Sequence, residues 1–302
     1  KEALTIALQI ALMLNCDIPD EIHVMRKTVI DGSNTSGFQR TAIVGLNGWI
    51  ETSFGKVGIT NVCLEEDSAQ IIEKGEKKVV YGLDRLGIPL VEIGTAPDIK
   101  SPEQAKEVAE KLGMILKSVK TKRGLGTIRQ DLNVSVEGGA RVEIKGVQRL
   151  GLIPKVIEIE AKRQESIIKK GGKVKKEVRK ALEDGTTEFL RPMPGAARLY
   201  PETDIPPIRI EKAYLEELKL ELPELLEAKI ERFIRQYGLD KELAKELAES
   251  KYAQIFEFLA EWANPKLLAT TLTSTLTQLK REGVNVENIS EKHLEQLFTA
   301  LE

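Results

Sequence analysis

Acidic side chains at two places in the sequence could hold a cation or act on a substrate. The first is the run 65–67, Glu65–Glu66–Asp67, at the end of an apolar stretch. Consecutive carboxylates repel one another unless something cationic lies beside them. The second is Glu92, inside the apolar segment 89–93. A single glutamate in such a strand is costly to bury unless it is paired or coordinates a cation.

Further polar side chains fall on one face of a predicted β-hairpin, residues 127–136 and 141–147. Strand alternation places on this face Arg129, Asp131, Asn133, Glu143 and Lys145. The face would offer carboxylate, amide and ammonium groups to phosphates and to Mg²⁺, which prefers hard oxygen ligands. Farther along, Arg191 and Arg198 lie on a proline-rich segment. There they could present guanidinium groups to phosphate at a low entropic cost.

Each of these features also has a purely structural interpretation. The run 65–67 could be a solvated strand end, and Glu92 could pair with Arg85 or lie on an exposed edge. One-sided antiparallel sheets commonly expose a polar face to water, and the segment 185–204 could be a domain linker. The usual phosphate-binding glycine loops are absent, and two histidines cannot form a multi-histidine zinc site.

The elements that must position these residues follow from periodicity and turn signals. Helical spacing predicts helices over 1–15, 102–119 and 154–170, with Ser101 as the N-cap of the second. Short extended segments, typical of a strand meander, are centred on 23–25, 42–44, 49–50, 57–59, 78–81 and 89–93. Residues 185–210 are rich in Gly, Pro and Arg without a period, which predicts a long loop. From 213 onward the pattern is helical.

The hairpin allows a specific prediction of register. A three-residue loop, 138–140, would pair Ser135 with Glu143 and Asn133 with Lys145, so that polar and apolar faces both match. A two-residue turn would place Val136 opposite Arg141 and mix the faces.

Composition indicates two domains in a chain of 302 residues that is 41% hydrophobic. The net charge of −2 hides an asymmetry, because residues 211–302 hold 12 basic and 18 acidic residues, so the rest carries the basic excess. A polyanionic substrate would therefore fit the first part better. No run approaches the ~18 apolar residues of a membrane span. Two cysteines form no disulfide framework, which predicts a cytoplasmic protein without a membrane partner.

Several long stretches resemble the GatB/GatE family of glutamyl-tRNA(Gln) amidotransferases, and its archaeal-type GatE branch more than its GatB branch. The stretches that carry the resemblance are RKTVIDGSNTSGFQRT (26–41), LEEDSAQ (64–70), RLGIPLVEIGTAPDI (85–99), IRQDLNVSV (128–136), RVEIKGVQ (141–148) and GTTEFLRPMPGAARLYPETDIPPI (185–208). Together they cover most of residues 20–210.

The resemblance implies an α+β fold, with a mostly antiparallel, cradle-like kinase and amidotransferase domain over 1–212. An all-helical domain that contacts tRNA would follow over 213–302. It implies that ATP phosphorylates the side chain of the glutamate on Glu-tRNA(Gln), and that ammonia then displaces the phosphate to give Gln-tRNA(Gln). An asparaginase-like D-type partner would supply the ammonia, in a heterotetramer or another heteromer.

On this basis Glu66 and Glu92 are our predicted metal ligands for Mg²⁺, with Asp131 and Glu65 as further candidates. Lys145, Arg191 and Arg198 are predicted to contact the phosphates of ATP. Arg129 and Asn133 are predicted to bind and orient the substrate.

The chain departs from the family pattern in three places. A strand carrying a Glu and a His of the metal site is expected before residue 1, a tail domain after residue 302, and an inserted domain near 172–184. Two other functions stay open at this point. One is a GatB-type enzyme that accepts Asp-tRNA and works with a glutaminase, and the other is a non-catalytic tRNA-binding protein of the complex. The ammonia source would identify the first, and failure to bind ATP–Mg²⁺ would identify the second.

Overall fold

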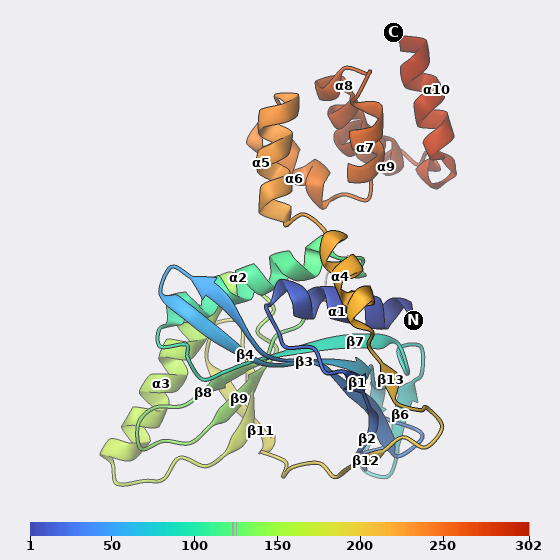
Figure 1. Cartoon of the computed structure of the whole chain (residues 1–302). Helices are drawn as coiled ribbons and strands as arrows, with labels where there is room; N and C mark the ends of the chain where they lie inside the picture. The colour runs from blue at the N-terminus through green and yellow to red at the C-terminus, as the bar shows by residue number, and fades with distance from the viewer. Residues whose placement is uncertain (123, 125, 302) are drawn as a thin grey trace. The chain divides into compact units, whose positions relative to one another are not determined.

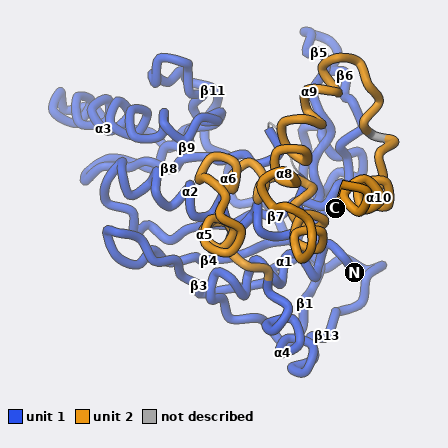
Figure 2. Tube along the Cα trace, turned by 90° about the horizontal axis from the view of Figure 1, so that it is seen from above, with its two compact units in different colours: residues 1–222 blue, residues 223–302 orange. Residues whose placement is uncertain are grey.

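The computed structural model describes residues 1–122, 124 and 126–301. They form two compact units, Lys1–Leu222 and Pro223–Glu302, which Figure 2 shows in different colours. The first unit mixes helices with mainly antiparallel sheets and the second is helical, so the predicted α+β class is confirmed. The predicted inserted domain and the predicted division at residues 212 and 213 stay predictions.

The first unit contains α1 (Glu2–Met13), β1 (Glu21–Ile22), β2 (Val24–Thr28), β3 (Phe38–Thr52), β4 (Gly55–Glu66), β5 (Gln70–Lys74), β6 (Val79–Gly82), β7 (Pro89–Thr95), α2 (Pro102–Ser118), β8 (Leu132–Val134), β9 (Val142–Lys145), α3 (Ile153–Lys169), β10 (Glu177–Ala181), β11 (Thr187–Pro192), β12 (Leu199–Pro201), β13 (Ile208–Arg209) and α4 (Lys212–Leu220).

The main sheet of this unit has the strand order β12-β2-β3-β4-β7, with antiparallel neighbours. Helices α1 and α2 lie on the same side of it (Figure 1). On that side Ala42, Leu64 and Val91 join the core that the apolar residues of the two helices complete. The packing is close at Gly48, where a Cβ atom would lie 2.4 Å from Cys16 Sγ, so that only glycine fits.

The predicted helices are confirmed in their main features. Helix α2 begins as its sequence indicates, because the Ser101 side chain accepts a hydrogen bond from the backbone N–H of Gln104 and Pro102 occupies the first turn. Helix α1 buries Leu8 and Ile10. Helix α3 starts at Ile153, also with a proline in its first turn.

The second sheet has the order β11-β10-β9-β8, and α3 packs against it (Figure 1). Strands β10 and β9 are parallel, whereas the other neighbours are antiparallel. The predicted hairpin exists, but its predicted register is wrong by two residues. Asn133 lies opposite Glu143, and the last pair is Val134 with Val142.

The cause of this shift is Gln164 of α3, which is fully buried. Its Nε2 atom donates to the Val134 carbonyl at 3.1 Å, and its Oε1 atom accepts from the Val136 N–H at 3.3 Å. Val136 is therefore bonded to the helix rather than to β9, and the strand stops at Val134. A shift of two residues preserves strand alternation, so the polar face is retained.

The prediction of a long loop over 185–210 is wrong in part. Strands β11, β12 and β13 all fall in it and pair with β10, β2 and β1 respectively. These strands are short and lie at sheet margins, where proline is tolerated and no hydrophobic alternation is required.

The second unit contains α5 (Leu226–Tyr237), α6 (Lys241–Glu249), α7 (Ala253–Leu259), α8 (Pro265–Thr270), α9 (Leu276–Arg281) and α10 (Glu291–Leu301). Its core includes Phe233 and Phe256, whose ring centroids lie 5.2 Å apart. Among the described residues of the whole chain, no helix is both long and apolar enough to cross a bilayer.

Candidate functional site

The face of the main sheet opposite α1 and α2 carries a group of polar side chains. Strand pairing places Thr41 beside Glu65 and Cys63 beside Glu92. Their sequence neighbours Ala42 and Leu64 belong to the core on the other side. Because side chains alternate along a strand, Glu65 and Glu92 point away from the core on one common face.

Glu65 is held by three donors on this face. The Lys27 ammonium lies 2.8 Å from its Oε1 atom, and the Thr41 hydroxyl donates to the same oxygen at 2.9 Å. Gln39 donates to Oε2 at 3.4 Å. Glu65 is 7% exposed, so its carboxylate is buried with a cation in contact.

Glu92 lies on the edge strand β7 and keeps access to solvent. Desolvation by the surrounding protein raises its pKa, and the charge and hydrogen bonding of Glu65 raise the pKa further. The ammonium of Lys27 acts in the opposite direction, and Asp131 adds another raising contribution. Two neighbouring carboxylates repel each other when both are charged, so a second cation beside them would stabilise their charged forms.

The second sheet contributes Lys145, whose Nζ atom lies 2.6 Å from both Asp131 and Glu143. Partial burial works to lower the pKa of this ammonium, but the hydrogen bonds to the two carboxylates outweigh it and the pKa is raised. Asn133 is exposed and lies opposite Glu143. Because the charge of Asp131 contributes to raising the pKa of Glu92, we group the charged residues of both sheets as the acid–lysine cluster: Lys27, Glu65, Glu92, Asp131, Glu143 and Lys145.

The structure does not bring Glu66 into this cluster. Glu66 follows Glu65 in β4 and so points to the opposite face, where the Arg40 backbone N–H and guanidinium both contact its carboxylate. Arg40 Nη1 lies 3.0 Å from the Glu66 carboxylate, and Arg40 Nε bonds the carboxylate of Glu202 at 2.7 Å. The expectation that Glu66 and Glu92 converge on one ion therefore fails, because adjacent residues of a strand cannot share a face.

Asp67 belongs to a third environment. It lies 3.3 Å from Arg129 and 3.8 Å from Arg85. The proposed pairing of Arg85 with Glu92 is therefore replaced by a pairing with Asp67. Each acid of the run 65–67 thus contacts a different basic side chain supplied by the protein itself.

The two arginines predicted to bind phosphate are both exposed. Arg191 lies beside Val178 in the second sheet, and its charge contributes to lowering the pKa of Asp31, although hydrogen bonds from Ser33 are the main cause. Arg198 precedes β12, and its carbonyl accepts from the N–H of Thr28 at 3.0 Å. Neither guanidinium is part of the acid–lysine cluster.

Mg²⁺ was predicted at this site, and the donors are of the kind it prefers. Glu65, Glu92 and Asp131 provide hard carboxylate oxygens, and Mg²⁺ commonly binds one or two such groups together with water and substrate phosphates. Among the described residues, however, no group of three or more His, Cys, Asp or Glu side chains is arranged to hold an ion by itself. The donor chemistry fits Mg²⁺ only with substrate oxygens as further ligands.

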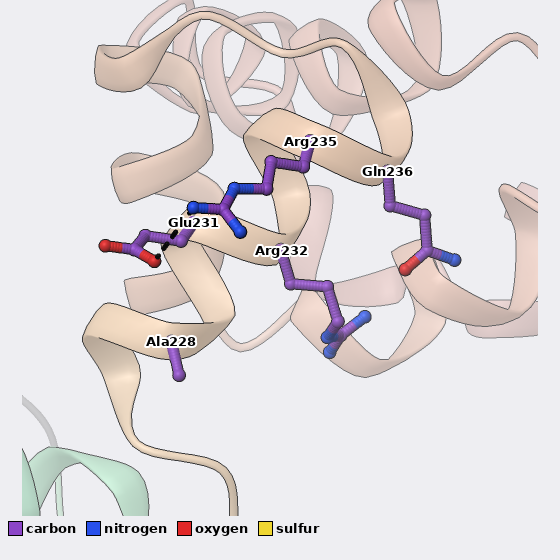
Figure 3. Close-up of a pocket in the computed structure, with 5 residues that line it drawn as sticks. All are labelled: Ala228, Glu231, Arg232, Arg235 and Gln236. Atoms are coloured by element: carbon purple, nitrogen blue, oxygen red, sulfur yellow. Dashed lines mark ion pairs between the residues drawn. The ribbon is translucent and has the colours of Figure 1, made fainter.

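A surface hollow of about 360 Å³ lies elsewhere, on α5 of the second unit (Figure 3). It is lined by Ala228, Glu231, Arg232, Arg235 and Gln236. Arg232 is bonded to Glu224, and Arg235 lies 3.8 Å from Glu231. Because both guanidinium groups are already paired with carboxylates, we do not assign chemistry to this hollow.

Known proteins match the chain along its whole length. A family model described as the GatB/GatE catalytic domain matches residues 1–216. The chain belongs to the GatB/GatE family. A curated relative from Methanocaldococcus jannaschii, named as the E-type chain of glutamyl-tRNA(Gln) amidotransferase, is 40% identical over 440 residues, with 100% of this chain and 70% of the relative covered. Proteins of the same name from Pyrococcus horikoshii and Archaeoglobus fulgidus are 39% and 38% identical, covering 99% and 97% of this chain and 68% of each relative.

The alignment with the Methanocaldococcus jannaschii member of the GatB/GatE family spans 440 residues, whereas this chain has 302. That relative therefore contains residues with no counterpart here.

Two residues that hold Glu65 in this GatB/GatE site, Lys27 and Thr41, were not predicted from the sequence, and neither was Arg40, which binds Glu66 on the opposite face. Lys27 and Arg26 are adjacent in β2, which indicates that they serve opposite faces, and the same holds for Arg40 and Thr41 in β3. Strand alternation alone could have assigned the faces. It could not have shown that β2, β3 and β4 pair in the register that brings these residues to Glu65 and Glu66.

Proposed function

We propose that this chain is the component of a tRNA-dependent amidotransferase that activates and amidates the glutamate of Glu-tRNA(Gln). In this proposal ATP phosphorylates the glutamate side chain, and ammonia from an asparaginase-like D-type partner displaces the phosphate. The observation that carries the proposal is the acid–lysine cluster, in a chain of the GatB/GatE family whose relatives are named as glutamyl-tRNA(Gln) amidotransferases.

The reaction brings together two anions, a carboxylate and a triphosphate, so catalysis must come from positioning and charge neutralisation. Lys27 and Lys145 supply two ammonium groups within the cluster, held at 2.6–2.8 Å by carboxylates. They are thereby fixed in position before substrate arrives, which lowers the cost of reorganisation. Arg129, Asn133, Arg191 and Arg198 are all exposed, and in this proposal they are the remaining candidates for contacts with phosphate and substrate.

When bound, Mg²⁺ would supply charge neutralisation at the terminal phosphates of ATP. Glu65 and Glu92 would hold it from the main sheet and Asp131 from the second sheet. Glu65 replaces Glu66 in this set because it shares a face with Glu92.

The test is the ATP- and ammonia-dependent conversion of Glu-tRNA(Gln), with ammonium chloride and, separately, with the asparaginase-like partner as the ammonia source. We expect Glu92→Gln to abolish amidation while circular dichroism and melting show an intact fold. Glu51→Gln is the matched control, since Glu51 is an exposed glutamate elsewhere on the main sheet. Full activity of Glu92→Gln would refute the site.

Two further measurements separate the other candidate functions. Titration calorimetry with ATP–Mg²⁺ should show binding, whereas a protein that only binds tRNA would show none. A GatB-type enzyme would accept Asp-tRNA and draw ammonia from a glutaminase, so activity with those components alone would contradict the GatE-type assignment.

A further inference from the structure

A short segment of the first unit crosses between the two sheets. Strand β11 is at the margin of the second sheet and β12 at the margin of the main sheet. Residues 193–198, which we call the strap, join them (Figure 1). The strap begins two residues after Arg191, which lies in β11, and it ends at Arg198, the other arginine predicted to bind phosphate.

Few backbone bonds hold the strap at the main sheet. Strand β12 is only three residues long. Outside that pairing, the Arg198 carbonyl accepts from the Thr28 N–H at 3.0 Å, and the Glu202 N–H donates to the Val24 carbonyl at 2.9 Å. Such a short marginal strand needs side-chain contacts to stay in place.

The side chain of Glu202 supplies these contacts. It is completely buried, and its carboxylate accepts hydrogen bonds from Arg26 and from Arg40, the latter at 2.7 Å. The Asp204 N–H donates to it as well, at 3.0 Å. The hydrogen bond from Arg26, with those from Asp204 and Arg40, lowers the pKa of Glu202 to about 2 although desolvation opposes this, so the carboxylate is ionised at physiological pH.

The contacts of the two arginines extend across the sheet. Arg40 also binds Glu66 of β4 at 3.0 Å, and Arg26 lies over the ring of Phe38 with 4.5 Å from its central carbon to the centroid. Glu202 is therefore bonded to residues of β2 and β3, and through Arg40 to β4. Charge-assisted bonds of this kind fix orientation because both partners are held by several atoms.

We propose that Glu202 is a positioning residue that anchors the strap to the main sheet and thereby holds Arg198 in place for the phosphates of ATP. The part of this inference that concerns ATP rests on the proposed function. The anchoring of the strap by Glu202 does not depend on it. Glu202 touches no substrate in this scheme and acts only through Arg198.

A double-mutant cycle on the full chain tests the proposal. Glu202→Gln and Arg198→Ala should each raise KM for ATP about tenfold, the size of one lost charge-assisted hydrogen bond, with a smaller change in kcat. Combining them should raise KM no further, because both changes remove the same interaction. Glu188→Gln is the control, since Glu188 is an exposed glutamate of β11 whose nearest cation, Lys180, is 3.9 Å away. An unchanged KM in Glu202→Gln, or effects that multiply in the double variant, would overturn the inference.

Limited trypsin digestion tests the anchoring of the strap without a measurement of amidation activity. Arg198 is the only basic residue between Arg191 and Arg209, and Pro192 protects the bond after Arg191. Glu202→Gln should therefore speed cleavage of the Arg198–Leu199 bond at least several-fold, whereas Glu188→Gln should not. If Glu202→Gln does not fold, Glu202→Asp keeps the charge but shortens the reach, and it should show the same acceleration. Equal cleavage rates refute the anchoring, while failure of the unaltered chain to amidate Glu-tRNA(Gln) refutes only the proposed function.

Discussion

At the scale of single residues, the acids that the sequence makes conspicuous are separated by the fold. Glu65 binds Lys27, Glu66 binds Arg40, and Asp67 lies beside Arg129. The sequence could predict that consecutive carboxylates need cations. It could not identify the cations, because each comes from a different strand or loop and is brought there only by tertiary pairing. The grouping of Glu92 with Asp131 was expected, whereas that of Glu92 with Glu66 was not realised.

The raised pKa of Glu92 leads to a prediction about pH. A carboxyl whose folded-state pKa lies above its unfolded value costs stability as pH rises from the unfolded value through the folded one. Glu92→Gln should remove that cost, so its Tm should exceed that of the unaltered chain at neutral pH and match it in acid. The gain should be small, because Glu92 is open to solvent that screens its charges.

Melting curves of Glu92→Gln and Glu51→Gln across pH check this expectation. A Tm difference for Glu92→Gln that does not vary with pH would contradict it. Higher stability combined with lost amidation would indicate that Glu92 is kept for function rather than for folding.

At the scale of elements, helices and sheet class were predictable where local signals were strong. The N-cap of α2 and the periodicity of α1 are local properties, so both predictions are confirmed. The hairpin register was not predictable, because a buried glutamine of α3 decides where β8 ends. The short strands β12 and β13 were missed for a related reason. Their pairing partners lie far away in the sequence, and their own residues carry no strand pattern.

The role of Gln164 can be measured. Gln164→Leu fills the same space but removes the donor to the Val134 carbonyl and the acceptor of the Val136 N–H, so the free energy of unfolding should fall by about 2–3 kcal/mol. Urea denaturation of the full chain gives this value. The exposed neighbour Glu165→Leu is the control, with an expected change under about 0.5 kcal/mol. Equal effects of the two substitutions would show that Gln164 does not determine the hairpin.

At the scale of the whole molecule, residues Pro223–Glu302 form a separate compact unit that is helical. Among the described residues, the buried members of its core cluster run from Leu226 to Phe298. Phe233, Phe256 and Leu259 are fully or almost fully buried within it. A hydrophobic core formed by residues of one unit provides the buried apolar surface that this unit needs to fold independently.

We therefore predict that residues 223–302 fold on their own. The fragment should be helical by circular dichroism and should unfold cooperatively in urea. Phe233→Ala should lower its free energy of unfolding by about 3–5 kcal/mol, because the buried ring contacts Tyr237 and Phe256 and its loss leaves a cavity. That cost is a large part of the 5–15 kcal/mol or so that stabilises a typical domain. Phe258→Ala is the matched control, since 54% of Phe258 is exposed and its removal should cost little. A fragment that stays unfolded, or one in which the two substitutions cost the same, would mean that the second unit depends on the first for its structure.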